Sequence, residues 1–400
     1  MTKLKKIHSY LIPIILAILP LWVVFLGEKV VPIFIIFLII IYLLEKKKKE
    51  NFWNNNKFLL PFLIYILIYI YYTLTSENIF ISIKFFERQL SMLIIPIIIF
   101  SYSWTKQKLK LLLETYLVIL ILICIYGFIK LGYFYFIWSD WINVLSPTYL
   151  QFKFPHLLHA HPTYWSYLLI YGNAILLSNK LLKINIKNNF WWFSFILFNI
   201  TLLILSARTP LLINTFLFIL SIIIGFRKNI IKPKIIIITT LLLLIILIII
   251  FNYSPLFSAK INSTFSDERF FLWPKAFNQI KANYFIFGEG VGNGSEILKN
   301  YLNTIDDPRI NYNGFDLHNQ YLRNYLDMGI LGFISLFYVI LSPILFLKKK
   351  LELSTLLSYS VSLIFLIGLF SESALSILKG IILISVIAPI SILVNKKFNV

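Results

Sequence analysis

The sequence has 400 residues, of which 59% are hydrophobic and 14% are charged, and its formal net charge is +20. Soluble globular domains carry about 25% charged residues, so this composition excludes a soluble globular protein. The apolar residues form long continuous runs, and only helices or closed barrels satisfy the backbone hydrogen bonds inside a bilayer. Since the runs do not alternate with polar residues, we predict an all-α, polytopic membrane protein.

Taken in chain order, the apolar runs predict about twelve membrane spans, each close to the roughly 20 residues that cross a bilayer as a helix. The predicted spans are residues 7–26, 30–44, 58–75, 90–104, 111–131, 162–179, 190–206, 210–226, 235–253, 326–347, 354–370 and 377–394. The first run resembles a signal peptide, but no small-residue cleavage site follows it, so we predict a retained span. Residues 1–400 are therefore predicted to form a single integral membrane domain.

Lysine clusters lie in alternate connections between these spans and at both ends of the sequence. Since Lys and Arg are enriched in cytoplasmic connections, we predict that both termini are cytoplasmic and that the other connections face outward. The basic residues are spread between the spans and not gathered on one face, which argues against a nucleic-acid partner. The single cysteine, Cys124, lies within an apolar run and excludes an intramolecular disulfide.

A long polar segment, residues 254–325, separates the ninth and tenth predicted spans. The lysine pattern places it on the outer face, whereas the cytoplasmic connections are short lysine-rich turns. Another outer connection, residues 76–89, has the pattern of a short amphipathic helix lying at the membrane interface. We therefore predict that any chemistry belongs to the outer segments.

The chain has 31 lysines but only six arginines, and five of the arginines are predicted to face outward. These five are Arg88, Arg208, Arg269, Arg309 and Arg323. Positive charge alone satisfies the topology, whereas a planar guanidinium also binds phosphate or carboxylate oxygens in a bidentate way. The pattern predicts an anion site on the outer face, with chance placement of a few residues as the alternative.

Two of these arginines occupy positions that favour a fixed role. Arg208 lies in a short turn between two apolar runs, where it either snorkels to the interface or faces a docked lipid-linked anion. Arg269 begins a segment whose apolar residues have helical spacing, and it follows two acidic residues that are typical of a helix start. It is therefore either part of a capping cluster or a second clamp for phosphate.

His318 is the candidate general base, because histidine titrates near neutral pH; a hydrogen-bonded interfacial histidine is the alternative. Glu372, between the last two spans, either orients His318, binds a sugar hydroxyl or is a plain turn acid. The Gly288–Gly294 stretch lacks the lysine of a P-loop and is interpreted as a tight turn whose backbone amides face an anion. His159 and His161 have no acidic or cysteine partner nearby in the sequence, so no metal site is predicted.

Several motifs together resemble the O-antigen ligase and O-antigen polymerase family. They are the Ser206-x-Arg208 turn, the Trp273-x-x-Ala276-x-x-x-Ile280 segment, the Gly-x-Gly-x-Gly stretch, and His318-Asn319-x-Tyr321-Leu322 before Gly329-Ile330-x-Gly332. The resemblance is strongest over residues 200–375 and is only topological before them. It implies a GT-C-like glycosyltransferase of the bacterial inner membrane, with an active site that faces the periplasm.

The resemblance also implies substrates and residue roles. Such a ligase transfers a glycan from undecaprenyl diphosphate to a sugar of lipid A–core, with inversion and without a metal ion or another cofactor. By position, His318 would be the catalytic residue, and Arg208 and Arg269 would bind the diphosphate. Supporting roles are expected for Glu372, Asn319, Tyr321, His161 and Arg323.

Other functions are left open by the sequence. A polymerase passes the glycan to another carrier-bound repeat, and related transferases glycosylate proteins. From a different class, a carrier-lipid flippase or transporter would need charged residues near the middle of several spans, where the predicted spans are nearly free of charge. A non-catalytic binding or assembly protein of the outer face is a further alternative.

Overall fold

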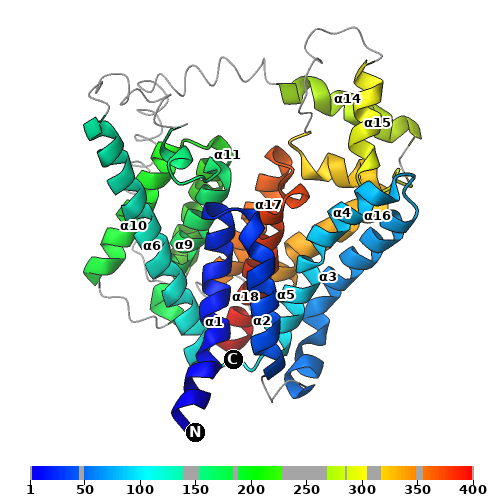
Figure 1. Cartoon of the computed structure of the whole chain (residues 1–400). Coiled ribbons are helices and arrows are strands. Elements are labelled where there is room, and N and C mark those ends of the chain that lie inside the picture. The colour runs from blue at the N-terminus through cyan, green and yellow to red at the C-terminus, as the bar shows by residue number, and fades with distance from the viewer. Residues whose placement is uncertain are drawn as a thin grey trace.

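The computed structural model describes residues 2–44, 49–137, 153–182, 188–227, 268–283, 286–303, 317–347 and 355–398. Its helices are α1 (Thr2–Phe25), η1 (Glu28–Val30), α2 (Val31–Leu44), α3 (Lys49–Leu74), α4 (Ile79–Gln89), α5 (Ser91–Ser101), α6 (Lys106–Ile137), α9 (Pro162–Leu182), α10 (Asn188–Leu205), α11 (Arg208–Arg227), α14 (Glu268–Asn283), α15 (Asn293–Asn303), α16 (Gln320–Leu345), α17 (Leu356–Ser371), η4 (Ala374–Ser376) and α18 (Leu378–Phe398). These residues form helices and no strands, which confirms the predicted all-α class. In Figure 1, both chain ends lie at the bottom of the bundle, and α14 and α15 lie at its top.

The helices agree closely with the predicted spans. Each predicted span has a matching helix except residues 235–253, which lie outside the described residues. Among the described helices, six are long and apolar enough to cross a membrane, and two shorter apolar helices cover Tyr10–Phe25 and Leu356–Ser371. The chain is thus a helical membrane protein, while the count of about twelve spans and the placement of the long loop stay predictions.

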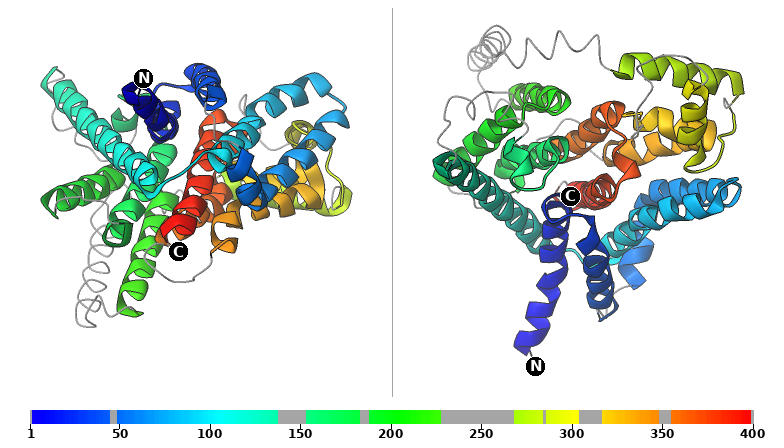
Figure 2. Two further views of the ribbon diagram at one scale, coloured as in Figure 1. Left: turned by 90° about the horizontal axis from the view of Figure 1, so that it is seen from below. Right: turned by 45° about the horizontal axis from the view of Figure 1, so that its top comes forward.

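Helix α18 lies at the centre of the bundle, as both views in Figure 2 show. Over an apolar stretch of 18 residues in α18, 94% is buried inside the protein. The helix packs against α1, α5, α16 and α17. A helix that is apolar all round is suited to burial on every side. The other helices are therefore arranged around α18.

The predicted polar loop contains two helices with an apolar core of their own. This core is separate from the main one and consists of Leu272, Ala276, Ile280, Leu298, Leu317 and Leu326, contributed by α14, α15, α16 and the segment before α16. Leu272, Ala276 and Ile280 recur at helical spacing, so they form one buried stripe of α14. The Trp-x-x-Ala-x-x-x-Ile motif is therefore the packing face that fixes this helix.

Helix α16 is broken at Gly329, which has φ 61° and ψ −157°. The rings of Tyr321 and Phe337, on either side of the break, stack with centroids 4.9 Å apart. In a straight helix, 16 residues would separate them by about 24 Å along the axis. The predicted span 326–347 has its counterpart in α16, which begins earlier, at Gln320, and contains a break at Gly329 that was not predicted.

The glycine stretch before α15 holds this break in place. The amide of Glu289 donates to the carbonyl of Leu326 (2.9 Å), and the amide of Gly290 donates to the carbonyl of Asp327 (3.0 Å). The amide of Gly294 donates to the Asp327 carboxylate (3.1 Å). A tight turn is present as predicted, and the acid that its amides meet is the Asp327 side chain of the protein itself.

Helix α4 matches the short amphipathic helix predicted at residues 76–89. Asn78 caps it by accepting from the amide of Ile81 (3.3 Å). Inside the helix, the Ser82 hydroxyl donates to the carbonyl of Val291 (2.6 Å) in the glycine stretch. Helix α4 is therefore a support for the turn that holds α16.

Candidate active site

A polar pocket of about 240 Å³ lies where four segments meet: the start of α9, the α10–α11 turn, the start of α14 and the end of α17. Its lining consists of Pro162, Thr163, Leu205, Ala207, Arg208, Thr209, Pro210, Arg269, Ser371 and Glu372. The structure thus brings Arg208 and Arg269 into one pocket, although separate elements carry them. We call this lining the arginine pocket.

Arg208 is the first residue of α11 and follows a sharp turn. Ser206 has φ 48°, and its hydroxyl donates to the carbonyl of Leu203 at the end of α10 (2.7 Å). The turn thereby reverses the chain within a few residues. An arginine at a helix N-terminus adds its charge to the positive end of the helix dipole, and both attract anions.

Arg269 lies in the first turn of α14, one turn before Trp273. The buried stripe of α14 attaches the helix to the small apolar core that it forms with α15 and α16, and the Trp273 indole donates to the carbonyl of Leu317 (2.9 Å). Leu317 directly precedes His318 in the sequence. The helix that carries Arg269 is therefore tied to the segment that carries His318.

His318 stands beside Glu372 at the edge of the arginine pocket. The Nδ1 atom of His318 lies 3.7 Å from Oε2 of Glu372, and the side chains are 45% and 17% exposed, respectively. The Thr163 hydroxyl donates to Oε1 of Glu372 (3.3 Å). Thr163, Glu372 and His318 thus form a polar chain from three helix ends, and the carboxylate can orient the imidazole.

His161 belongs to the same electrostatic environment. His161 is exposed to solvent, and partial desolvation by the surrounding protein lowers its pKa from the usual 6.5. Glu372 opposes this shift, whereas the charges of Lys379 and His318 add to it. Near neutral pH, His161 is therefore an uncharged imidazole among charged groups.

Two residues near this site, Thr163 and Lys379, were not predicted from the sequence. Lys379 lies at the start of α18, outside every lysine cluster that the topology uses, and this isolation was the available signal. Thr163 had no signal, because a threonine at a helix start is ordinary. Lys379 and Glu372 both act electrostatically on His161, with opposite effects on its pKa.

Other residues predicted to support the site have structural contacts. Asn319 caps α16 by accepting from the amide of Leu322 (3.1 Å), and the Tyr321 hydroxyl donates to the carbonyl of Leu366 (2.8 Å). Arg323 lies 3.9 Å from Asp327 and over the ring of Phe85, away from the arginine pocket.

Of the remaining arginines predicted to face outward, Arg88 donates to the carbonyl of Ser376 (3.1 Å), and Arg309 lies outside the described residues. No group of three or more His, Cys, Asp or Glu side chains suited to a metal ion occurs within the part of the chain that the structure describes.

The apolar helices define this chain as an integral membrane protein with a polar, arginine-lined pocket at one end. Residues 193–337 match the model of the O-antigen ligase family. The match confirms the resemblance drawn from the motifs, and it includes Arg208, Arg269 and His318, while Glu372 lies beyond it. Members of the family are membrane enzymes of glycosyltransferase type that use polysaccharide or lipid-linked glycan substrates.

The chain is also similar to a protein of Haemophilus influenzae that is described only as uncharacterized. The two are 31% identical over 104 residues, which is 26% of each chain. The alignment thus spans about a quarter of the relative's length and carries no statement about its activity.

Proposed function

We propose that the protein is a glycosyltransferase of O-antigen ligase type. It moves a glycan from undecaprenyl diphosphate to a sugar of lipid A–core, with inversion at the anomeric carbon and without a metal ion. The observation that carries this proposal is the meeting of Arg208 and Arg269 in one pocket with Glu372, next to His318.

The two arginines act on the leaving group. As the bond from the anomeric carbon to the diphosphate breaks, its electron pair and negative charge pass to the diphosphate oxygen. Guanidinium groups fixed in a partly enclosed pocket stabilise this charge more strongly than groups in bulk water do. Because they are held by the α10–α11 turn and by α14, they need little rearrangement during the reaction.

His318 acts on the nucleophile. The acceptor hydroxyl attacks the anomeric carbon from the face opposite the diphosphate, and its proton passes to the imidazole. Glu372, at 3.7 Å from Nδ1, orients the ring for transfer at Nε2 and stabilises the imidazolium that forms. Thr163 holds Glu372 through Oε1.

We also propose that the pocket faces the periplasm from the bacterial inner membrane, with both termini in the cytoplasm. The lysine pattern supports this orientation. So does the arrangement in Figure 1, in which the chain ends and α14 lie at opposite ends of the bundle.

The test is transfer by variants purified in membranes or detergent, with undecaprenyl-diphosphate-linked glycan as donor and lipid A–core as acceptor. Arg208→Ala, Arg269→Ala and His318→Ala should each lower transfer by about a hundredfold or more. Arg227→Ala is the matched control, because Arg227 is an exposed arginine at the opposite end of the helix that begins with Arg208. Full transfer by the His318 variant would contradict its role as the base.

A deletion strain separates the ligase from the polymerase of the same family. Loss of all polymer from lipid A–core, with carrier-linked polymer accumulating, identifies a ligase. A single repeat left on the core identifies a polymerase.

A further inference from the structure

The segment that joins α17 to α18 carries Glu372 and contains the short η4 turn. Its backbone is extended at both ends, since Glu372 has φ −147° and ψ 138° and Ile377 has φ −122° and ψ 151°. Between them, Ala374–Ser376 form one 3₁₀ turn, which cannot satisfy all of its backbone groups internally. Buried amides and carbonyls of this segment therefore need partners from neighbouring helices.

Two glutamines hold the backbone of one residue in the η4 turn. The amide of Leu375 donates to Oε1 of Gln320 in α16 (2.8 Å), and Nε2 of Gln89 in α4 donates to the carbonyl of Leu375 (2.7 Å). Leu375 is 1% exposed, and Gln320 and Gln89 are 3% and 2% exposed, so water does not compete for these bonds. The turn is thus held from two sides, by α4 and by α16.

The orientation of the Gln320 side chain is fixed by its partners. A backbone amide only donates, so the atom of Gln320 that faces Leu375 is its oxygen. Its Nε2 donates to Oδ1 of Asn324 (2.6 Å), whose Nδ2 donates to the hydroxyl of Tyr65 in α3 (3.2 Å). Gln320 therefore uses both an acceptor and a donor, which an apolar side chain of the same length does not have.

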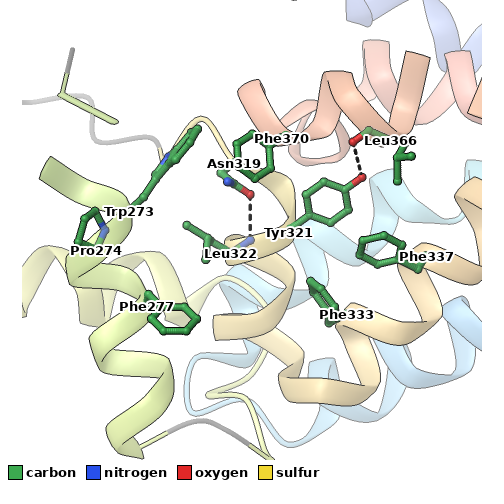
Figure 3. Close-up of a pocket in the computed structure, with 10 residues that line it drawn as sticks. All are labelled: Trp273, Pro274, Phe277, Asn319, Tyr321, Leu322, Phe333, Phe337, Leu366 and Phe370. Atoms are coloured by element: carbon green, nitrogen blue, oxygen red, sulfur yellow. Dashed lines mark hydrogen bonds between the residues drawn. The ribbon is translucent and has the colours of Figure 1, made fainter. Parts of the chain in front are cut away.

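The neighbours of Gln320 in the sequence bind other parts of the protein. Figure 3 shows Asn319 accepting from the amide of Leu322 in its own helix, and Tyr321 donating to the carbonyl of Leu366 in α17. Gln320, between them, binds the η4 turn. Successive residues thus join the start of α16 to α17 and to the turn that follows it.

The bond between Gln320 and Leu375 joins the same two segments as the contact between His318 and Glu372. Gln320 lies two residues after His318, and Leu375 lies three residues after Glu372. The distance of 3.7 Å from Nδ1 of His318 to Oε2 of Glu372 is longer than a hydrogen bond, so it depends on how the two backbones are held. A displacement of about 1 Å can lower a catalysed rate by about a hundredfold.

We propose that Gln320 and Gln89 are positioning residues: by holding the backbone of Leu375 from both sides, they hold Glu372 beside His318. This inference rests on the proposed function, and it adds two residues that do not line the arginine pocket. Because Gln89 belongs to α4 and Gln320 to α16, two helices together fix the carboxylate relative to the imidazole.

The experiment measures kcat and KM for glycan transfer by the purified full chain, with Gln320→Met and Gln89→Met as variants. Methionine keeps the length of the side chain and removes its hydrogen bonds. Each variant should lower kcat about tenfold and leave KM for the undecaprenyl-diphosphate-linked donor within about twofold, because Arg208 and Arg269 stand on other helices. Unchanged kcat in both variants, or a loss that appears in KM alone, would overturn the proposal.

A double-mutant cycle tests whether Gln320 acts through Glu372. In the Glu372→Gln background, Gln320→Met should lower kcat by less than about twofold, because the carboxylate that it positions is already absent. Effects of the two changes that multiply would show that Gln320 acts independently of Glu372 and would contradict the proposal.

Ser362→Ala is the matched control. The Ser362 hydroxyl of α17 donates to the carbonyl of Ile340 in α16 (2.9 Å), so it also makes a buried bond between these two helices. Ser362 lies ten residues before Glu372, about 15 Å along the helix. This variant should leave kcat and KM unchanged. A tenfold loss of kcat would show that any weakened contact between α16 and α17 slows transfer, which would overturn the specific role of Gln320.

Hydrogen exchange distinguishes a failure of this proposal from a failure of the proposed function. The Leu375 amide should exchange at least about tenfold faster in Gln320→Met than in the wild type, and at the wild-type rate in Ser362→Ala. If exchange responds in this way but the wild-type chain transfers no glycan, the proposed function fails while the glutamines still hold the turn. Unchanged exchange in Gln320→Met would overturn the positioning role whatever the activity.

Discussion

Left-handed backbone conformations occur next to the site at residues other than glycine. Within the described residues they are His159, Ser206 and His318, with φ of 53°, 48° and 47°. Each lies in the turn before α9, α11 or α16, the helices that begin at the site. Such a conformation costs a non-glycine residue about 1–2 kcal/mol. The strain is concentrated where three helix starts converge on the arginine pocket.

We expect Glu372→Gln to slow glycan transfer about ten- to a hundredfold, because the imidazolium formed at His318 would lose the carboxylate beside it. The same change removes the acid from the arginine pocket, so inorganic diphosphate should bind at least as tightly as before. Transfer assays and diphosphate titration of one preparation measure both effects. Thr163→Val is the milder companion variant, and an unchanged transfer rate in Glu372→Gln would contradict the orienting role.

The lowered pKa of His161 predicts a small pH dependence of stability. In the unfolded chain, histidine binds its proton near pH 6.5, whereas the folded protein binds it at lower pH. The unfolded state therefore holds more protons in this window, and stability falls as the pH drops below 6.5. Thermal unfolding in detergent at pH 5.5 and 7.5 should show a smaller difference for His161→Gln than for the wild type.

Among the elements, α16 shows what the sequence pattern could and could not predict. The apolar run after Leu326 predicted a helix, and the structure contains one. Its break was hidden because a glycine within an apolar helix is usually tolerated, so Gly329 carried no signal of its own. The break depends on the distant segment at Ile286–Gly288, whose carbonyl and amide occupy the place of a side chain at Gly329.

The residues of the candidate site differ in how far their own stretch of sequence makes them recognisable. Arg208, Arg269 and His318 could be selected as candidates because each chemical group is unusual in its stretch of sequence, and the structure brings the two arginines into one pocket. The Glu372–His318 contact was not predictable, since it requires helices far apart in the chain to meet. Spacing along one helix predicts a face, but it does not identify what lies opposite.

Gly329→Ala should disrupt the folded arrangement of α16. An added Cβ would lie 2.3 Å from the carbonyl oxygen of Ile286, and alanine disfavours φ 61°. We expect a loss of at least about 2 kcal/mol of stability, together with strongly reduced transfer. Gly132→Ala in α6 is the control, because no atom lies within 4 Å of its added Cβ. Equal melting temperatures for the two variants would contradict this expectation.

At the scale of the whole molecule, the lysine pattern and the arrangement of the bundle together predict that α15 lies outside the membrane and that the start of α6 lies in the cytoplasm. The buried Cys124 is the single cysteine, so the wild type should react little with an impermeant maleimide. In intact spheroplasts, Lys299→Cys in α15 should be labelled, whereas Lys106→Cys at the start of α6 should be labelled only after lysis. Both lysines are exposed. Labelling of Lys106→Cys in intact cells would reverse the predicted orientation.

The central position of α18 has a consequence for how the protein is made. Helix α18 leaves the ribosome after the helices that surround it, so those helices enter the membrane before their common neighbour exists. Lipid tails are as apolar as the surface of α18 and can cover the same faces in the meantime. The bundle would then close around α18 by exchanging lipid for protein. A chain terminated before α18 should therefore insert its helices without assembling the arginine pocket. Helices α16 and α17 would lack the helix that they pack against.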